Sequence, residues 1–289
     1  MIARGVETAR RRGHVGAIGR SSMTIALVSL GYMPGGPWVA LREIEGLDEA
    51  AVGGNDAAAA ILLLDRLFVP GPGARIPEDG AIGLAVSDRD RLLAHVYTRV
   101  YGARVESTVH CRRCHQPYDL DFSLDEAQEA HEQEARDASV LREDDGTFVA
   151  PGAGRFRLPT GLDERAVRGL SPANAATALI ERCVIERASG QDGDDALQLA
   201  MEVVGPMLDL TLPAACPECG ANQSVRFDIQ SYLLNTLLQE RPRLVRDVHL
   251  LATIYGWSRA DILSLPRTER RAYTALIESG AAAGTRWSA

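Results

Sequence analysis

The chain has 289 residues, of which 46% are hydrophobic and 24% are charged, and its formal net charge is −8. This composition is typical of a globular protein with one elaborate domain or two small ones. Apart from His, every basic residue is Arg, and an acidic chain without Lys is a poor general binder of phosphate backbones. Composition therefore argues against nucleic acid as a partner.

No apolar run reaches the roughly 18 residues that a transmembrane helix requires, so we expect no membrane partner. The short apolar segment 23–30 follows Arg10, Arg11 and Arg12, as in a signal peptide, but no small-x-small cleavage site follows it. Zinc-binding thiolates, which the paired cysteines further along the chain indicate, favour a reducing compartment. These features predict a cytoplasmic protein.

The N-terminal part is expected to hold an extension and then a small α/β segment. Residues 1–36 are rich in Gly and Arg, which predicts a poorly ordered extension. Residues 37–102 form the α/β segment, which begins with an alternating strand at 38–44. Apolar side chains at helical spacing predict a helix over 57–68.

A loop and a second helix complete this segment. Three prolines and four glycines between residues 69 and 83 predict a loop. The capping-box pattern Ser87-Asp-Arg-Asp90 then predicts the start of a helix that ends at Gly102.

Two CxxC pairs carry most of the chemical information, and 101 residues separate them. Each pair lies between two alternating, β-branched stretches, which predicts a β-hairpin with the cysteines at its tip. Residues 103–123 and 208–229 would be the two halves of a split zinc ribbon, and Gly220 suits its turn. Four thiolates complete the tetrahedral set of one structural Zn²⁺ per chain. The expected ligands are Cys111, Cys114, Cys216 and Cys219.

Three other interpretations of the cysteines are weaker. A redox CxxC normally opens a helix after a strand, and neither pair has that setting. Two separate metal sites completed by His110 or His115 remain an alternative. A disulfide framework is not needed, because a chain of this length can bury a sufficient hydrophobic core without it. Cys183 lies on the apolar side of a helical pattern, which is typical of a small core residue.

Residues 124–207 form an insertion between the two half-ribbons. The stretch 124–145 is strongly acidic and has no large apolar stripe, which predicts a solvated helix followed by a loop. A short hairpin is expected around 147–158. Two helices should follow, near 172–187 with Ser171 as N-cap and near 194–206.

Residues 230–289 are expected to form a helical C-terminal region, which makes the overall fold class α+β. Pro242 interrupts the first apolar stripe, Gly256 ends a helix, and Ser258-Arg-Ala-Asp261 opens a short one. The last helix is expected over 268–279.

This helical pattern has two interpretations. A helix-turn-helix DNA reader would use Arg267, Arg270 and Arg271 for base contacts. The alternative is an αα-hairpin that packs on the ribbon and exposes these arginines to solvent. Net charge favours the second interpretation.

The stretch 246–277 resembles the C-terminal signature of a family of tail-assembly proteins. That family is encoded beside contractile phage tails and extracellular contractile injection systems, and it is similar to the baseplate hub assembly chaperones of T-even phages. Larger members also carry two CxxC knuckles with a Phe-Asp-Ile exit, here 227–229, and the early motifs 41–48 and 63–67 agree. The matching residues of the signature are His249, Tyr255, Trp257, Ile262, Leu263, Leu265, Pro266, Arg270, Arg271, Tyr273, Leu276 and Ile277.

The resemblance implies a non-enzymatic role in building or completing a baseplate, as a component or as an assembly chaperone. Its implied partners are baseplate hub, spike or wedge proteins of the same gene cluster. The chain also lacks GxSxG, HExxH, P-loop and dinucleotide-binding motifs. The remaining alternative is a zinc-ribbon nucleic-acid-binding protein related to transcription.

Partner binding is expected at the C-terminal helices. Arg270 and Arg271 follow the Leu-Pro turn and are candidate docking residues. Tyr255, Trp257 and Tyr273 are expected in the core of the helical end or in a docking groove beside it.

Overall fold

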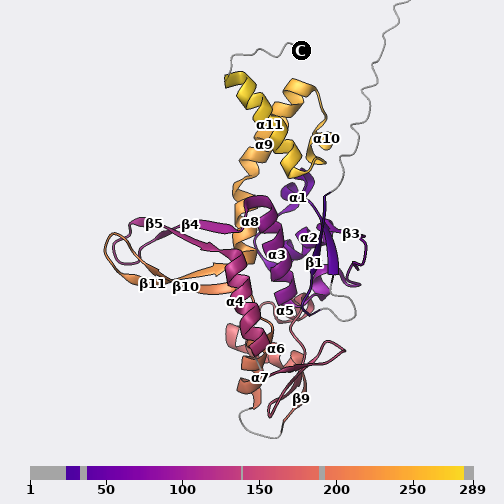
Figure 1. Ribbon diagram of the computed structural model, residues 1–289, viewed down its shortest axis with the longest axis vertical. Coiled ribbons are helices and arrows are strands. Elements are labelled where there is room, and N and C mark those ends of the chain that lie inside the picture. Colours follow the sequence, from indigo (N-terminus) through magenta and orange to yellow (C-terminus); the bar gives the residue numbers. More distant parts are fainter. Residues whose placement is uncertain (1–23, 33–37, 138, 189–192, 283–289) are drawn as a thin grey trace, which may run out of the picture.

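The computed structural model describes residues 24–32, 38–137, 139–188 and 193–282. Over these residues the chain is a mixed α+β protein with eleven α-helices and small antiparallel sheets, as the sequence predicts. Figure 1 shows an elongated body with a two-hairpin arm projecting from its side.

A small antiparallel sheet opens the described chain. Strand β1 (Ile25–Ser29) pairs with β2 (Trp38–Arg42), and β2 pairs with β3 (Phe68–Val69). Strand β1 falls inside the extension that was expected to be poorly ordered, so that prediction is wrong for residues 25–29. Successive side chains of β1 point to opposite faces of the sheet, and Val28 is the one that points into the core and is buried. Residues 1–23 and 33–36 lie outside the described part of the chain.

Four helical elements pack against this sheet, and their leucines form the main core. The most buried are Leu63, Leu64, Leu67, Leu92 and Leu93. The expected loop at 69–83 contains a short 3-10 helix, and the expected capping box at 87–90 is wrong. Ala85 is the N-cap, and Ser87 lies inside the helix, where its hydroxyl donates to the carbonyl of Gly205 at 2.8 Å. The elements are α1 (Gly46–Ala51), α2 (Ala57–Leu67), η1 (Gly80–Gly83) and α3 (Val86–Tyr101).

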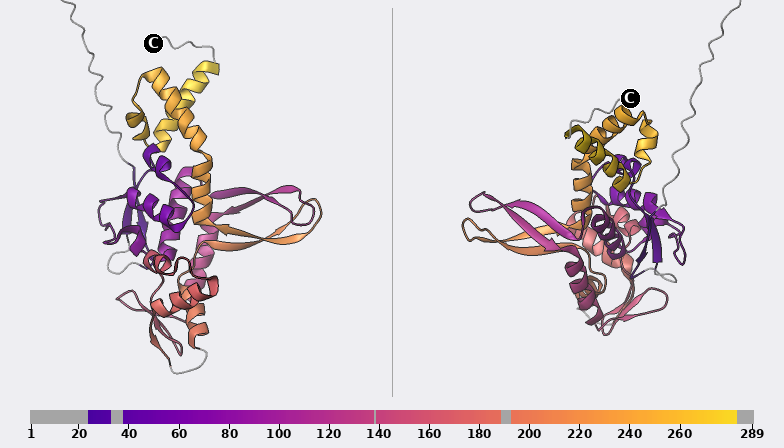
Figure 2. Two further views of the ribbon diagram at one scale, coloured as in Figure 1. Left: turned by 180° about the vertical axis from the view of Figure 1, so that it is seen from behind. Right: turned by 45° about the horizontal axis from the view of Figure 1, so that its top comes forward.

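Two long β-hairpins form the arm, as predicted. Figure 2 shows them projecting side by side from the body and meeting at their tips. The first pairs β4 (Arg104–His110) with β5 (Pro117–Ser123), and the second pairs β10 (Asp209–Ala215) with β11 (Asn222–Asp228).

The insertion between the hairpins forms a second body. Its four-stranded sheet has the order β6-β7-β8-β9. The expected loop after the acidic helix instead contributes strand β6, and the helix expected at 172–187 ends at Cys183, where β9 begins. The elements are α4 (Leu124–Asp137), β6 (Leu141–Arg142), β7 (Phe148–Ala150), β8 (Gly154–Phe156), α5 (Gly161–Val167), α6 (Pro172–Cys183), β9 (Val184–Arg187) and α7 (Gly193–Val204).

The C-terminal region is helical, and its breaks follow the sequence signals. Gly256 ends α9 in the left-handed conformation with φ 69°, and Ser258 caps α10. Helices α9 and α10 contact α1, and with α11 they lie at the end of the body, away from the arm, so the expected packing of the αα-hairpin on the ribbon is wrong. The elements are α8 (Ile229–Gln239), α9 (Arg241–Tyr255), α10 (Arg259–Leu263) and α11 (Arg267–Ala282).

Candidate metal centre

The four cysteines of the two CxxC pairs come together at the joined tips of the arm. Their sulfur atoms all lie within 4.8 Å of one another. Cys111 Sγ is 3.6 Å from Cys219 Sγ, and Cys114 Sγ is 3.7 Å from Cys216 Sγ. A tetrahedral ion with metal–sulfur bonds of about 2.3 Å separates its ligands by about 3.8 Å. The cluster could therefore hold a metal ion.

The same backbone turn presents each cysteine pair. In the first turn, the N–H of His115 donates to the carbonyl of Cys111 at 3.0 Å. In the second, the N–H of Gly220 donates to the carbonyl of Cys216 at 2.9 Å. The residue after the second cysteine is left-handed in both turns, as expected for Gly220 but not for a histidine.

No histidine joins this cluster. Among the described residues, the four cysteines form the one group of His, Cys, Asp or Glu side chains that could hold an ion. The arrangement therefore disfavours two separate sites completed by His110 or His115. His115 instead takes the backbone conformation that the turn demands.

The turn also favours the charged form of one sulfur. Backbone N–H groups of Cys114 and Arg113 point at Cys111 Sγ and lower the pKa of that thiol to about 6. For Cys114, burial and the neighbouring sulfurs outweigh the N–H of Gln116 and raise the pKa to about 12. A cation among these sulfurs would favour the thiolate form of all four.

Contacts along the arm keep the two hairpins in register. At the base, the rings of Phe122 and Phe227 meet edge to face with centroids 4.9 Å apart. Nearer the tip, the amide of Gln223 donates to Tyr118 Oη at 2.8 Å and to the carbonyl of His110 at 3.2 Å. No sequence motif signals the Gln223 bridge, because its partners belong to the other hairpin.

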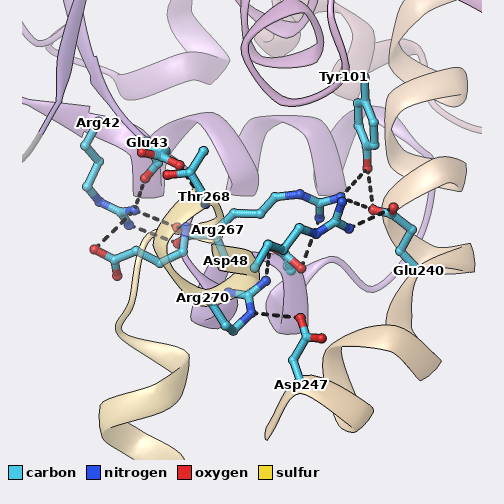
Figure 3. A network of polar contacts seen from close by, with 12 residues as sticks. Arg42, Glu43, Asp48, Tyr101, Glu240, Asp247, Arg267, Thr268 and Arg270 are labelled. Carbon is cyan, nitrogen blue, oxygen red and sulfur yellow. Dashed lines mark hydrogen bonds and ion pairs between the residues drawn. The ribbon is translucent and has the colours of Figure 1, made fainter. Parts of the chain in front are cut away.

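Neither of the two arginines expected at a docking surface is freely exposed. Arg270 is fully buried and pairs with Glu49 at 2.7 Å and with Asp247 at 3.4 Å (Figure 3). Arg271 is half-buried and donates to Glu240 at 2.9 Å, while Arg267 is buried and also pairs with Glu240. The prediction that these arginines are exposed to solvent is therefore wrong, and the disfavoured alternative of a DNA-reading helix loses the base contacts that they would have made.

The three aromatic residues of the C-terminal signature pack on one another. Tyr255 stacks on Trp257 with centroids 4.9 Å apart, and Tyr273 meets Trp257 edge to face at 5.1 Å. All three are half-buried around Leu251, Ile262 and Ile277. They belong to the core of the helical end, as expected.

Cys183 lies apart from the metal centre. Its side chain is buried, and burial raises the pKa of the thiol to about 11. A thiol held in its neutral form is a core residue and not a nucleophile.

No family model matches the chain, and neither a search of curated proteins nor one of solved structures gave a significant match. Within the described residues, no helix is long and apolar enough to cross a membrane.

Proposed function

We propose that the four cysteines bind one structural Zn²⁺ per chain. The observation that carries this proposal is the pair of sulfur–sulfur distances of 3.6 and 3.7 Å within a cluster no wider than 4.8 Å, which suits a tetrahedral ion with four thiolate ligands. Four protein ligands leave no open position for water, so the ion would hold the arm together and catalyse nothing. Zinc content is the direct test.

We further propose that the protein is a non-enzymatic component or assembly chaperone of the baseplate of a contractile phage-tail-like injection system. The resemblance of segment 246–277 and of the two knuckles supports this function. The projecting arm suits such a role, because a rigid hairpin pair can reach a partner that the body does not touch. The implied partners are hub, spike or wedge proteins.

The tip of the arm is the surface that we assign to this partner. Arg112 and Arg113 are exposed there, between the two cysteines of the first turn. The buried arginines of α11 are excluded as a docking surface. Exposed arginines at a rigid tip fit an acidic patch on a partner protein.

Co-expression with the neighbouring genes tests the function. The full-length protein should co-purify with a hub, spike or wedge protein, and Arg112→Glu with Arg113→Glu should lose that complex while keeping its metal. The matched control is Arg165→Glu with Arg168→Glu, two exposed arginines of the second body, which should keep it. Tight binding of duplex DNA or RNA at physiological salt, without such a complex, would instead support the nucleic-acid alternative.

A further inference from the structure

An eleven-residue sequence occurs twice in the chain. Segment 42–52 reads REIEGLDEAAV and segment 157–167 reads RLPTGLDERAV, so seven of the eleven positions are identical. Each segment begins where a central strand ends, at the last residue of β2 in the first case and directly after β8 in the second, and each runs into a short helix, α1 or α5. The repeat therefore falls on equivalent structure.

The side-chain contacts of the two segments also repeat. Arg42 donates through Nη1 to Asp48 Oδ2 at 2.6 Å and through Nη2 to Asp48 Oδ1 at 2.9 Å. Arg66, near the end of α2, donates through Nε to the same Oδ1 at 2.9 Å. Arg42 also reaches the carbonyl of Glu43 at 3.0 Å and that of Arg66 at 2.9 Å.

The second segment has the same five contacts on matching atoms. Arg157 donates to the two carboxylate oxygens of Asp163 at 2.6 and 2.9 Å, and Arg182, near the end of α6, donates through Nε to Asp163 Oδ1 at 2.9 Å. Arg157 also reaches the carbonyl of Leu158 at 3.1 Å and that of Arg182 at 3.1 Å. Both aspartates are buried, so each turn is built around an equivalent buried carboxylate that two partly exposed arginines bind.

The order of elements around these turns is the same in both halves. A first unit runs β1, β2, α1, α2, β3, α3, β4, β5 and α4. A second unit runs β7, β8, α5, α6, β9, α7, β10, β11 and α8. In each unit the central strand pairs antiparallel with the other two. Strand β6, η1 and the helices after α8 are additions to this common plan.

Contacts between the units follow the pattern of a two-fold dimer. Cys111 matches Cys216 and Cys114 matches Cys219, and the short sulfur contacts join Cys111 to Cys219 and Cys114 to Cys216. Such reciprocal contacts define an isologous interface. Phe122 and Phe227 are matching residues that touch each other, as residues near a two-fold axis do.

Each repeated turn also receives the start of another helix in the same way. Ala85 forms a bridge with Thr160, and the N–H of Val86 donates to the carbonyl of Pro159 at 3.0 Å. Pro266 forms the matching bridge with Glu45, and the N–H of Arg267 donates to the carbonyl of Ile44 at 2.9 Å. The two arriving sequences are LAVSDR at 84–89 and LPRTER at 265–270.

The last residue of each arriving sequence is an arginine that pairs with the glutamate of the turn. Arg89 pairs with Glu164, with Nη2 to Oε1 at 3.0 Å, and Arg270 Nη2 pairs with Glu49 Oε1 at 2.7 Å. The turn glycine makes room for this approach. A Cβ on Gly46 would lie 2.9 Å from Leu263, and one on Gly161 would lie 3.0 Å from the carbonyl of Ile82.

We propose that the chain is a tandem duplication of one unit, and that the Gly-Leu-Asp-Glu turn of each unit is a docking site for a helix start of the pattern Leu-x-x-Ser/Thr-Asp/Glu-Arg. The site at 46–49 holds the C-terminal helix α11, and the site at 161–164 holds α3. The metal centre lies where the two units meet and takes one cysteine pair from each. This last point rests on the proposed metal site, whereas the two docking sites do not.

The two sites have different consequences for the rest of the molecule. Helix α11 ends the described chain, so its release would leave the arm intact. Helix α3 leads directly into β4 and so to Cys111, and its release would loosen the metal centre. The Arg270–Glu49 pair should be stronger than the Arg89–Glu164 pair. Arg270 and Glu49 are both almost fully buried, whereas Glu164 is 31% exposed.

Two double-mutant cycles in the zinc-loaded full-length protein test this proposal. The variants remove charge and do not reverse it, because reversed charges at 49 and 270 would meet Arg267 and Asp247. One cycle comprises Glu49→Gln, Arg270→Gln and both together; the other comprises Glu164→Gln, Arg89→Gln and both together. Hydrogen exchange at the start of the docked helix, α11 in the first cycle and α3 in the second, should become roughly 100-fold faster in Arg270→Gln. In each cycle the double variant should exchange at least roughly tenfold more slowly than the product of the two single effects.

A second readout separates the two sites. Arg89→Gln should lower the retention of metal against a chelator, whereas Arg270→Gln should leave it unchanged. Coupling in only one cycle, or in neither, would overturn the equivalence of the two sites. If a glutamine variant does not fold, Arg89→Lys and Arg270→Lys replace it, since Lys keeps the charge but loses the planar fork of N–H donors. Both Lys variants should then speed exchange at the start of the docked helix, and an increase in only one would contradict the proposal.

Discussion

His115 and Gly220 occupy the same position in the two CxxC turns, with φ of 60° and 67° respectively. Glycine adopts this left-handed conformation without a steric penalty, whereas a residue with a Cβ pays about 1 kcal/mol or more. The first turn is therefore strained and the second is not.

His115→Gly should stabilise the folded protein, and Gly220→Ala should destabilise it by about 1 kcal/mol. The gain at His115 should be smaller, about 0.5 kcal/mol, because glycine also loses more backbone entropy on folding. Chemical denaturation of the metal-loaded protein measures both. A loss of stability in His115→Gly would show that the imidazole makes a contact that outweighs the strain.

The burial of Arg270 predicts that replacing it costs far more stability than replacing an exposed arginine of the same helical region. Arg270→Ala removes a buried cation that Glu49 and Asp247 share, leaving Glu49 with Arg267 alone, and should cost roughly 3–5 kcal/mol. Arg246→Ala is the matched control, since that side chain is 67% exposed in its pair with Glu278 and should cost less than about 1 kcal/mol. Equal effects in thermal unfolding would contradict the buried network of Figure 3.

Asp90 predicts an unusual pH dependence of stability. Burial raises the pKa of its carboxyl to about 7, although Arg89 and the N–H of Leu208 act against this, and Asp228 and Glu164 lie near enough to reinforce it. In the unfolded chain this carboxyl has a pKa of about 3.9, which is lower than its pKa in the folded protein. Its contribution to the stability of the fold is therefore fully present below pH 4 and is lost as the pH rises to 7.

Asp90→Asn should remove this loss, because the amide resembles the neutral carboxyl. Relative to the parent protein, the variant should gain on the order of 1 kcal/mol or more between pH 5 and pH 8. Urea unfolding at the two pH values gives this difference, and the metal centre affects both proteins alike. A difference that does not change with pH would mean that Asp90 stays ionised throughout.

The shared site predicts equal roles for the two cysteine pairs. Cys111→Ser and Cys216→Ser should destabilise the protein to the same extent, because each opens the same set of ligands. Chelation should loosen the arm without unfolding the body, since the leucine core around α2 is separate from the tip. Hydrogen exchange along β4 and β11 before and after chelation follows the change. Faster exchange throughout α2 as well would contradict this separation.

Local signals in the sequence predicted most of the secondary structure. The two CxxC hairpins, the Ser258 cap and the left-handed Gly256 depend on neighbours within a few residues, so their sequences specify them. The prediction of a capping box at Ser87 is wrong because its side chain bonds to a residue far along the chain and not to its own helix. The carbonyl of Gly205 takes the hydroxyl that would otherwise have capped the helix.

Burial of charge could not be predicted in this way. Arg270 has its partners in α1 and α9, and nothing within its own helix indicates them. One signal was nevertheless present in the sequence, since Gly-Leu-Asp-Glu occurs at both 46–49 and 161–164. An internal repeat of this kind would have indicated that the chain contains equivalent units.

The central claim is that one ion joins the two halves of the chain at Cys111, Cys114, Cys216 and Cys219. Native mass spectrometry of the full-length protein, with elemental analysis of the same sample, tests it most directly. The account predicts one zinc per chain in the parent protein and in Cys183→Ser, and none in a variant that has lost either CxxC pair. Two ions per chain, no ion, or an ion that survives the loss of one pair would contradict it.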